Sequence, residues 1–199
     1  MVVIGLTGGI ASGKSLAASV LSGLGAAVID ADKVGHEIIA PGTRAYAELI
    51  GHFGERILRE DGHIDRKKLG EIIFSDAEER KVLNRITHPR ILEQTASLLE
   101  EIESKNSQSV AVIEAALLIE MGLQEYVDEV WVVVTDEEKQ IERLRERSGL
   151  KYEEAVNRIR SQLSQEEKAA NADKVLYNTR DEEFLRRQVV SLWYSLSTS

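Results

Sequence analysis

The sequence predicts an α/β fold with a five-stranded parallel sheet flanked by helices. Five short apolar runs of strand length alternate with segments whose apolar residues recur at helical spacing. The first run leads directly into a glycine-rich loop and a helical pattern, the order of a phosphate-binding unit. With 199 residues, 43% hydrophobic and 30% charged, the chain is long enough for one soluble core domain with insertions. The expected strands are residues 2–6, 26–29, 110–113, 130–134 and 174–177.

The loop after the first run reads GGIASGKS and fits the pattern GxxxxGK[ST]. Its glycines let backbone N–H groups point at phosphate oxygens, and the following helix adds its positive N-terminal end. Lys14 is placed to reach the β- and γ-phosphates, and the Ser15 hydroxyl to ligate Mg²⁺. The alternative is a glycine-rich turn that binds nothing. The residues expected to bind the nucleotide are Gly8, Gly9, Ile10, Ala11, Ser12, Gly13, Lys14, Ser15 and Leu16.

Composition excludes several classes of function. The formal net charge of −9 argues against a nucleic-acid partner held on a broad basic surface. The absence of cysteine excludes disulfides, thiolate catalysis and thiolate zinc sites. The first apolar run is broken by glycine, and the other apolar stretches are too short to span a bilayer. We therefore expect a soluble, cytoplasmic protein without a membrane or nucleic-acid partner.

Two aspartates follow the second apolar run. Asp30 and Asp32 stand at its carboxyl end, the edge of a parallel sheet where ligands bind. Being two apart, they would point to the same side of an extended chain, and one of them could face the γ-phosphate. In the alternative interpretation, Asp32 caps a helix that begins near Lys33.

Residues from about 33 to 108 are dominated by helical spacing and divided by glycines. We expect a helical insertion that carries the second substrate. Its basic residues either contact that substrate or form a solvated face paired with interleaved acids. Pro89 favours a helix that begins near Arg90, with His88 at the helix start or in contact with substrate. The basic residues are Arg66, Lys67, Lys68, Arg80, Lys81, Arg85 and Arg90.

The third apolar run ends in Glu114, a carboxylate suited to hold Mg²⁺ or its water shell at the sheet edge. Residues 115–120 are expected to lead into a short helix. After the fourth run, Thr135 and Asp136 are expected to cap the next helix, which ends at Gly149.

Arginines on the next two helical segments suggest a lid. Arg143 and Arg147 are four residues apart and therefore share one helix face. A second helix with further arginines is expected over residues 152–165. Lid arginines would neutralise charge on a transferring phosphoryl group and exclude water. The alternative is a set of surface arginines paired with glutamates one turn away.

Along its whole length the chain resembles the dephospho-CoA kinase family. Only the phosphate loop is specific by itself, so the order and spacing of the shared runs carry the resemblance. Ala116 departs from the family, in which a proline usually precedes the paired leucines. The shared runs are GLTGGIASGKS at 5–15, VIDAD at 28–32, THP at 87–89, ALLIE at 116–120, the lid run from Gln140 through Arg143 and Arg147, RIRSQLSQEEK at 158–168, ADKVLYN at 172–178 and a Trp near the end.

The resemblance implies a three-layer fold similar to the nucleoside monophosphate kinases. Residues 1–199 would form one such domain. It implies ATP-dependent phosphorylation of the ribose 3′-hydroxyl of dephospho-CoA, which gives CoA and ADP in the last step of CoA synthesis, with ATP and Mg²⁺. The implied parts are a core of residues 1–32, 109–136 and 170–199, a helical CoA-binding insertion at about 33–108 and a lid at about 137–169.

The resemblance also implies roles for individual residues. Asp32 matches the family's proposed catalytic acid, which would accept or orient the proton of the 3′-hydroxyl. Lys14, Mg²⁺ and the lid residues Arg143 and Arg147 would stabilise the transferring phosphoryl group. Asn178 would lie near the adenine of ATP.

Three other functions compete with this hypothesis. Another small-molecule or nucleoside monophosphate kinase of the same fold fits the phosphate loop, but the VIDAD and RIRSQ runs count against it. A GTPase-like switch uses an NKxD motif, and the sequence contains no Asn-Lys pair. A scaffold with a relic loop fits poorly with an intact Lys14 and Ser15. We expect a monomer or weak homo-oligomer whose partner is the small molecule dephospho-CoA.

Overall fold

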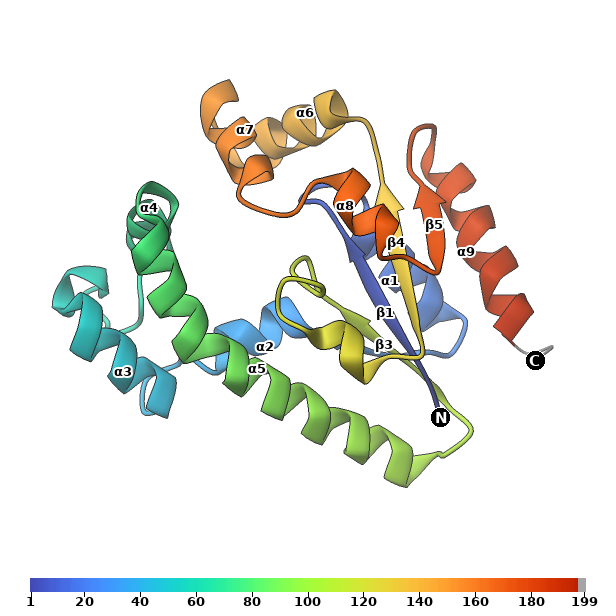
Figure 1. Ribbon diagram of the computed structural model, residues 1–199, viewed down its shortest axis with the longest axis horizontal. Helices are drawn as coiled ribbons and strands as arrows, with labels where there is room; N and C mark the ends of the chain where they lie inside the picture. The colour runs from blue at the N-terminus through green and yellow to red at the C-terminus, as the bar shows by residue number, and fades with distance from the viewer. Residues whose placement is uncertain (197–199) are drawn as a thin grey trace. The chain divides into compact units, whose positions relative to one another are not determined.

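A parallel sheet organises the computed structural model, which describes residues 1–196 (Figure 1). All neighbouring strands are parallel, and their order is β2-β3-β1-β4-β5. This confirms the predicted five-stranded sheet. The strands are β1 (Val2–Gly8), β2 (Ala27–Asp30), β3 (Val110–Glu114), β4 (Glu129–Val134) and β5 (Lys174–Tyr177).

The strand order reverses at β1, the place where open parallel sheets form a ligand-binding crevice at the carboxyl ends of their strands. The chain fills one side of β1 with β2 and β3 before it crosses to β4 and β5 on the other side. Glu114 pairs in register with both Leu6 and Asp30, and Gly8 pairs with Val133, so the carboxyl ends of four strands meet at one edge. In open parallel sheets, ligands bind at this edge where the strand order reverses.

The helical segments belong to two compact units. The first, here called the sheet unit, comprises Met1–Asp30 and the chain from Leu98 onward, and the second, the helical unit, comprises Ala31–Ser97. Among the described residues, no helix has the length and apolar content needed to cross a membrane. The helical segments are α1 (Lys14–Gly23), α2 (Ala31–Glu37), α3 (Arg44–Phe53), η1 (Glu55–Ile57), α4 (Arg66–Ser75), α5 (Ala77–Lys105), η2 (Leu123–Tyr126), α6 (Glu137–Ser148), α7 (Tyr152–Arg160), α8 (Gln165–Ala170) and α9 (Glu182–Leu196).

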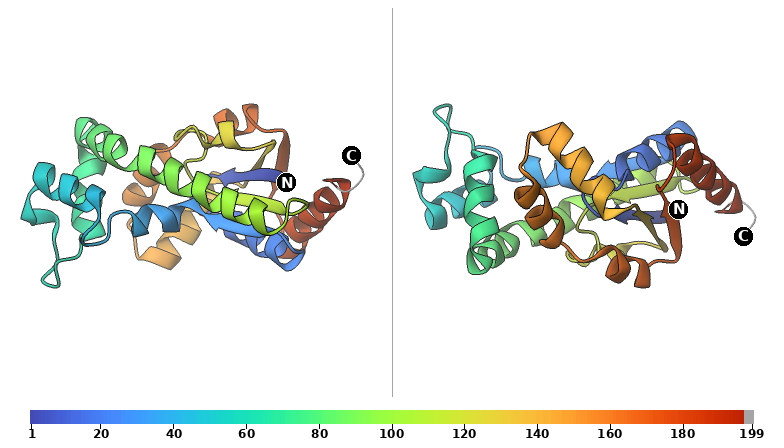
Figure 2. Two further views of the ribbon diagram at one scale, coloured as in Figure 1. Left: turned by 90° about the horizontal axis from the view of Figure 1, so that it is seen from below. Right: turned by 90° about the horizontal axis from the view of Figure 1, so that it is seen from above.

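In the sheet unit, α1 and α9 lie side by side and pack on the sheet (Figure 2). Leu21 of α1, Trp131 of β4 and Leu185 of α9 are fully buried in one apolar cluster. Because this cluster anchors α1 to the sheet, it fixes the start of the helix that follows the phosphate loop.

The helical unit has an apolar core of its own. Leu49 and Phe53 of α3, Ile57 of η1 and Leu69 of α4 are buried together. The Thr43 hydroxyl accepts a hydrogen bond from the Tyr46 N–H and so caps α3. The expectation of helical pieces separated by glycine is thus met by α3, which ends at Gly54.

The predicted helix start near Arg90 is wrong, because α5 continues through Pro89. A proline inside a helix removes one backbone hydrogen bond. Here the Arg90 guanidinium donates to the carbonyl of Ile86, and the Thr87 hydroxyl donates to the carbonyl of Leu83. Helical sequence on both sides of Pro89, packed through Ile86 and Ile91, outweighs the lost bond.

Residues 115–120 lead through a turn into the short 3₁₀ helix η2, as expected. Two other local predictions in the sheet unit are corrected. Thr135 caps nothing, because its hydroxyl donates to the carbonyl of Asn178, and Asp136 occupies the N-cap position of α6 without a side-chain cap bond. The expected helix over residues 152–165 is two helices, because Ser164 starts α8 with a capping box.

Candidate active site

The phosphate loop lies at the crevice and its glycines are enclosed by neighbouring groups. Gly13 has φ +103°, a left-handed conformation that favours glycine, and a Cβ there would collide with the Asn178 amide nitrogen. A Cβ on Gly8 would lie 2.5 Å from the carbonyl oxygen of Val133 and 2.6 Å from Oγ of Ser12. The glycines are therefore required by close packing around the loop as well as by its turn.

Three polar side chains meet where the loop enters α1. Lys14 Nζ donates to Glu114 Oε1 at 2.8 Å, and Ser15 Oγ donates to the same oxygen at 2.9 Å. The Lys14 and Glu114 side chains are only 11% and 10% exposed. A nearly buried charge has to be paired, and here the carboxylate at the end of β3 pairs with the lysine of the loop. The structure thus brings Lys14, Ser15 and Glu114 together.

The two candidate lid arginines differ in their contacts. Arg143 Nη1 donates to the carbonyl of Ala11 in the loop at 3.0 Å. Arg147, one turn further along α6, is exposed, and within residues 1–196 neither arginine forms an ion pair with a glutamate. Arg143 therefore reaches the loop, whereas Arg147 faces solvent.

Asn178 follows β5 and is 3% exposed. Its Nδ2 donates to the carbonyl of Ser12 at 2.7 Å, and its own carbonyl accepts from Thr135 Oγ1 at 2.7 Å. The side-chain amide therefore holds the loop backbone. Leu16, another expected nucleotide residue, is half-buried and packs against the core of the sheet unit.

The structure places Asp32 differently from either interpretation of the sequence. α2 begins at Ala31, so Asp32 lies in the first helical turn and is not the helix cap. Asp30 is the last residue of β2, and the chain is therefore not extended from Asp30 to Asp32. The prediction that these two carboxylates share one side of an extended chain is wrong. Asp32 is exposed on the helical unit.

A cavity of about 510 Å³ lies within the helical unit. Its apolar wall includes Ile39 and Ile64, and Asp65 is the one carboxylate among the residues that line it. The Asp65 side chain accepts from the N–H groups of Lys67 and Lys68, so it acts as the N-cap of α4. The basic and imidazole side chains in the lining are His36, Arg59, His63, Arg66 and Lys67.

One carboxylate stands next to this lining. Asp61 Oδ1 accepts from the N–H of His63 at 3.0 Å, and this bond holds the pKa of the Asp61 carboxyl below its ordinary value. Arg59 adds to the effect, with Nε 3.6 Å from the same oxygen. Asp61 therefore stays ionised and offsets part of the positive charge beside the cavity.

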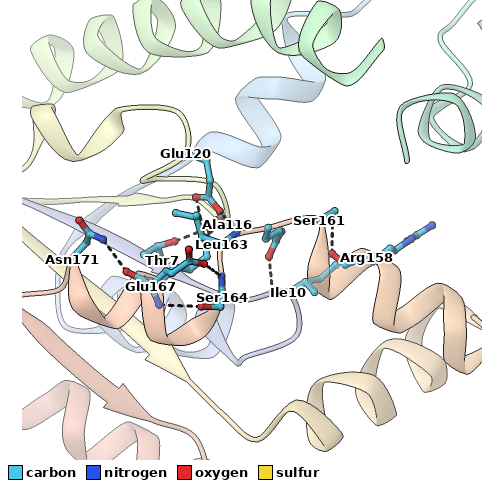
Figure 3. A network of polar contacts seen from close by, with 12 residues as sticks. Thr7, Ile10, Ala116, Glu120, Arg158, Ser161, Leu163, Ser164, Glu167 and Asn171 are labelled. Atoms are coloured by element: carbon cyan, nitrogen blue, oxygen red, sulfur yellow. Dashed lines mark hydrogen bonds and ion pairs between the residues drawn. The ribbon is translucent and has the colours of Figure 1, made fainter. Parts of the chain in front are cut away.

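Sequence reasoning missed a buried ion pair between α8 and the segment that follows β3. Lys168 of α8 is fully buried, and its Nζ donates to both oxygens of Glu120 at 2.8 and 3.0 Å and to the carbonyl of Ala116 at 2.7 Å. Glu120 also accepts from the N–H of Leu163 (Figure 3). The Ser164 capping box was a usable signal for α8, but no local pattern joins Lys168 to a residue 48 positions away.

We expect Lys168→Met to lower the free energy of unfolding by about 3 kcal/mol, because it leaves the Glu120 carboxylate without its cation. Denaturant unfolding followed by circular dichroism measures this. Lys105→Met is the matched control, since Lys105 pairs with Glu101 at 2.6 Å but is 71% exposed, and it should cost less than about 1 kcal/mol. Equal losses in the two variants would contradict the importance of the buried pair.

Comparison with known proteins agrees with this geometry. The family model described as dephospho-CoA kinase matches residues 2–183. A Geobacter sulfurreducens protein named dephospho-CoA kinase is 48% identical over 97% of this chain and 98% of its own length. A Moorella thermoacetica protein of the same name is 44% identical over 98% of this chain and 92% of its own length.

Solved structures show the same relation. The dephospho-CoA kinase from Campylobacter jejuni has 30% identity and a TM-score of 0.72, covering 98% of this chain and 97% of that one. Shikimate kinase from Aquifex aeolicus has a TM-score of 0.53 at 15% identity over 99% of both chains, which shows the shared fold alone. From its sequence and its fold, the chain belongs to the dephospho-CoA kinase family.

Proposed function

We propose that this protein transfers the γ-phosphoryl group of ATP to the ribose 3′-hydroxyl of dephospho-CoA, giving CoA and ADP in the last step of CoA biosynthesis. The observation that carries this function is the meeting of Lys14, Ser15 and Glu114 at the crevice, in a chain of this family. A nucleoside monophosphate kinase of the same fold is not favoured, because the family model and the named relatives are dephospho-CoA kinases.

ATP would be held by the loop, with its phosphates against backbone N–H groups and Lys14. The enclosed glycines support this role because they keep side chains out of the loop. Since the Asn178 amide is bonded to Ser12, we propose that Asn178 shapes the loop from behind. That Asn178 also lies near the adenine of ATP stays a prediction.

The oxygens of Ser15 and Glu114 fit Mg²⁺. They lie 2.9 Å apart, and both are the hard ligands that this ion prefers. Within residues 1–196, no group of three or more His, Cys, Asp or Glu side chains is arranged to hold a metal. Mg²⁺ is commonly bound by one or two protein oxygens together with substrate phosphates, and when bound it neutralises charge on them.

The lid of about residues 137–169 would complete the site. Arg143 already contacts the loop, and Arg147 presents its guanidinium from the same helix. We propose that both arginines stabilise charge on the transferring phosphoryl group. We keep the division into a core, a helical insertion of about residues 33–108 and this lid as a proposal. The separate core of the helical unit supports the insertion.

We propose that the helical unit binds the acceptor. Asp32 and His36 are one turn apart on α2, so they share a helix face, and His36 lines the basic cavity. Dephospho-CoA carries a diphosphate, which suits a cavity with several cations and an apolar wall. Asp32 would then orient the 3′-hydroxyl and accept its proton.

We further propose a cytoplasmic enzyme that is monomeric or weakly self-associating. The absence of cysteine is compatible with a reducing compartment.

Replacement of the loop lysine tests the proposed function. We expect Lys14→Ala to lower kcat by at least about 10²-fold, because it removes a main electrostatic stabiliser of the phosphoryl group. ADP release with Mg²⁺-ATP and dephospho-CoA measures this. Lys105→Ala, on an exposed part of α5, should leave the rate unchanged. Near-normal turnover by Lys14→Ala would overturn the assignment of the loop.

Asp32→Asn should reduce kcat by at least about 10²-fold while the affinity for ATP stays within about twofold, because the carboxylate would act on the acceptor hydroxyl. Turnover and binding of a fluorescent ATP analogue are measured on the same preparation. Glu78→Gln makes the same change from carboxylate to amide at an exposed position of the same unit, outside the cavity, and serves as the control. A collapse of ATP binding in Asp32→Asn would assign this residue to the metal or to folding instead.

The cavity is tested by removing two of its cations. The double variant Arg66→Ala/Lys67→Ala should raise KM for dephospho-CoA by about tenfold and leave KM for ATP unchanged, because charged contacts to the diphosphate are lost. The matched control, Arg44→Ala/Lys81→Ala, removes the same charge from exposed sites outside the cavity. Equal effects of the two double variants would show that only net charge matters.

A further inference from the structure

The backbone of Ile10, inside the phosphate loop, is held on both sides by glutamine side chains from outside the loop. Its N–H donates to Gln162 Oε1 at 3.1 Å, and its carbonyl accepts from Gln140 Nε2 at 2.7 Å (Figure 3 labels Ile10). Gln140 is 1% exposed. Buried amides rarely leave their hydrogen-bonding groups without partners, so the position of Gln140 restricts where this carbonyl lies.

Gln140 is itself fixed by a third glutamine. Its Oε1 accepts from Gln165 Nε2 at 3.1 Å. Gln165 also bonds both backbone groups of Thr135, accepting from its N–H and donating to its carbonyl at 2.7 Å each. A continuous chain of hydrogen bonds between amide groups therefore runs from Thr135, at the end of β4, through Gln165 and Gln140 to Ile10. We call Gln140, Gln162 and Gln165 the glutamine clamp.

Gly9 gives an independent indication of this clamp. A Cβ at Gly9 would lie 2.5 Å from Gln140 Nε2. Gly9 is not among the glycines with positive φ in the described chain, so its backbone conformation does not itself require glycine. The glycine instead leaves room for the close approach of the Gln140 amide, which would have to shift if residue 9 carried a Cβ.

The loop also makes apolar contacts with α6 and α7. Ile10 and Ala11 lie against a cluster formed by Ile141 and Leu144 of α6 and Ala155 of α7. Polar and apolar contacts thus join the tip of the loop to the elements that carry the clamp.

We infer that the glutamine clamp positions the phosphate loop for ATP, so that α6, the α7–α8 connection and the end of β4 together determine its affinity for the nucleoside triphosphate. Gln140 and Gln162 act as positioning residues because they bond the loop backbone, and Gln165 acts through its hydrogen bond to Gln140. This inference rests on the proposed function, because it takes the loop as the ATP site.

The principal test is Gln140→Met, which keeps the length of the side chain and removes its amide. In the full-length enzyme we expect KM for ATP to rise about tenfold, with kcat and KM for dephospho-CoA within about twofold. Gln188→Met is the matched control. Gln188 bonds both backbone groups of Tyr177 at the end of β5, at 3.0 and 2.8 Å, as Gln165 does with Thr135, and has no bond to the loop.

An unchanged KM for ATP in Gln140→Met, or an equal rise in Gln188→Met, would overturn the inference. If Gln140→Met does not fold, Gln162→Met replaces it, because Gln162 is only half-buried. The same rise in KM for ATP is expected there, and an unchanged value would likewise overturn the inference.

A double-mutant cycle tests the contact with Gly9. Gly9→Ala should raise KM for ATP, and Gly9→Ala/Gln140→Ser should raise it by less than the product of the two single effects, because the shorter side chain makes room for the Cβ. Independent effects would contradict the contact. Failure of the wild-type enzyme to phosphorylate dephospho-CoA would instead overturn the proposed function, and binding of a fluorescent ATP analogue would still test the clamp.

Discussion

The conformation of the phosphate loop is the constraint on which the rest of the site depends. Its backbone must curve with N–H groups directed inward, which leaves carbonyl groups that need partners elsewhere. The structure supplies three such partners from two segments. Gln140 and Arg143 of α6 donate hydrogen bonds to the carbonyls of Ile10 and Ala11, and Asn178, after β5, donates to the carbonyl of Ser12. The loop is thus held by side chains that lie more than a hundred residues further along the chain.

Charge is concentrated locally in a chain whose formal net charge is −9. Lys14 of the loop is paired with Glu114 at the end of β3, and Lys168 of α8 is paired with Glu120 in the segment that follows β3. Both pairs are largely removed from water, so each partner depends strongly on the other. Exposed i, i+4 pairs such as Lys105 with Glu101 contribute little. Of the two buried pairs, Lys14–Glu114 ties β3 to the loop, and Lys168–Glu120 ties α8 to the segment that follows β3.

Features that depend on neighbouring residues in the sequence could be predicted, whereas contacts between residues far apart in the sequence could not. The phosphate loop, the five strands and Glu114 at a strand end follow from motif spacing and apolar runs, because these depend on neighbours in sequence. Continuation of α5 through Pro89 depends on packing on both sides of the proline, which a local rule does not include. The glutamine clamp escaped prediction because its amides meet Ile10 and Thr135 only after the sheet has formed.

We propose above all that the ATP bound at this loop phosphorylates one acceptor, dephospho-CoA. This proposal is tested most directly by ADP release from purified protein with Mg²⁺-ATP and a panel of dephospho-CoA, adenosine, AMP, CMP, UMP and shikimate. We predict turnover with dephospho-CoA alone. Turnover with a nucleoside monophosphate and none with dephospho-CoA would keep the loop as an ATP site and contradict the proposed function.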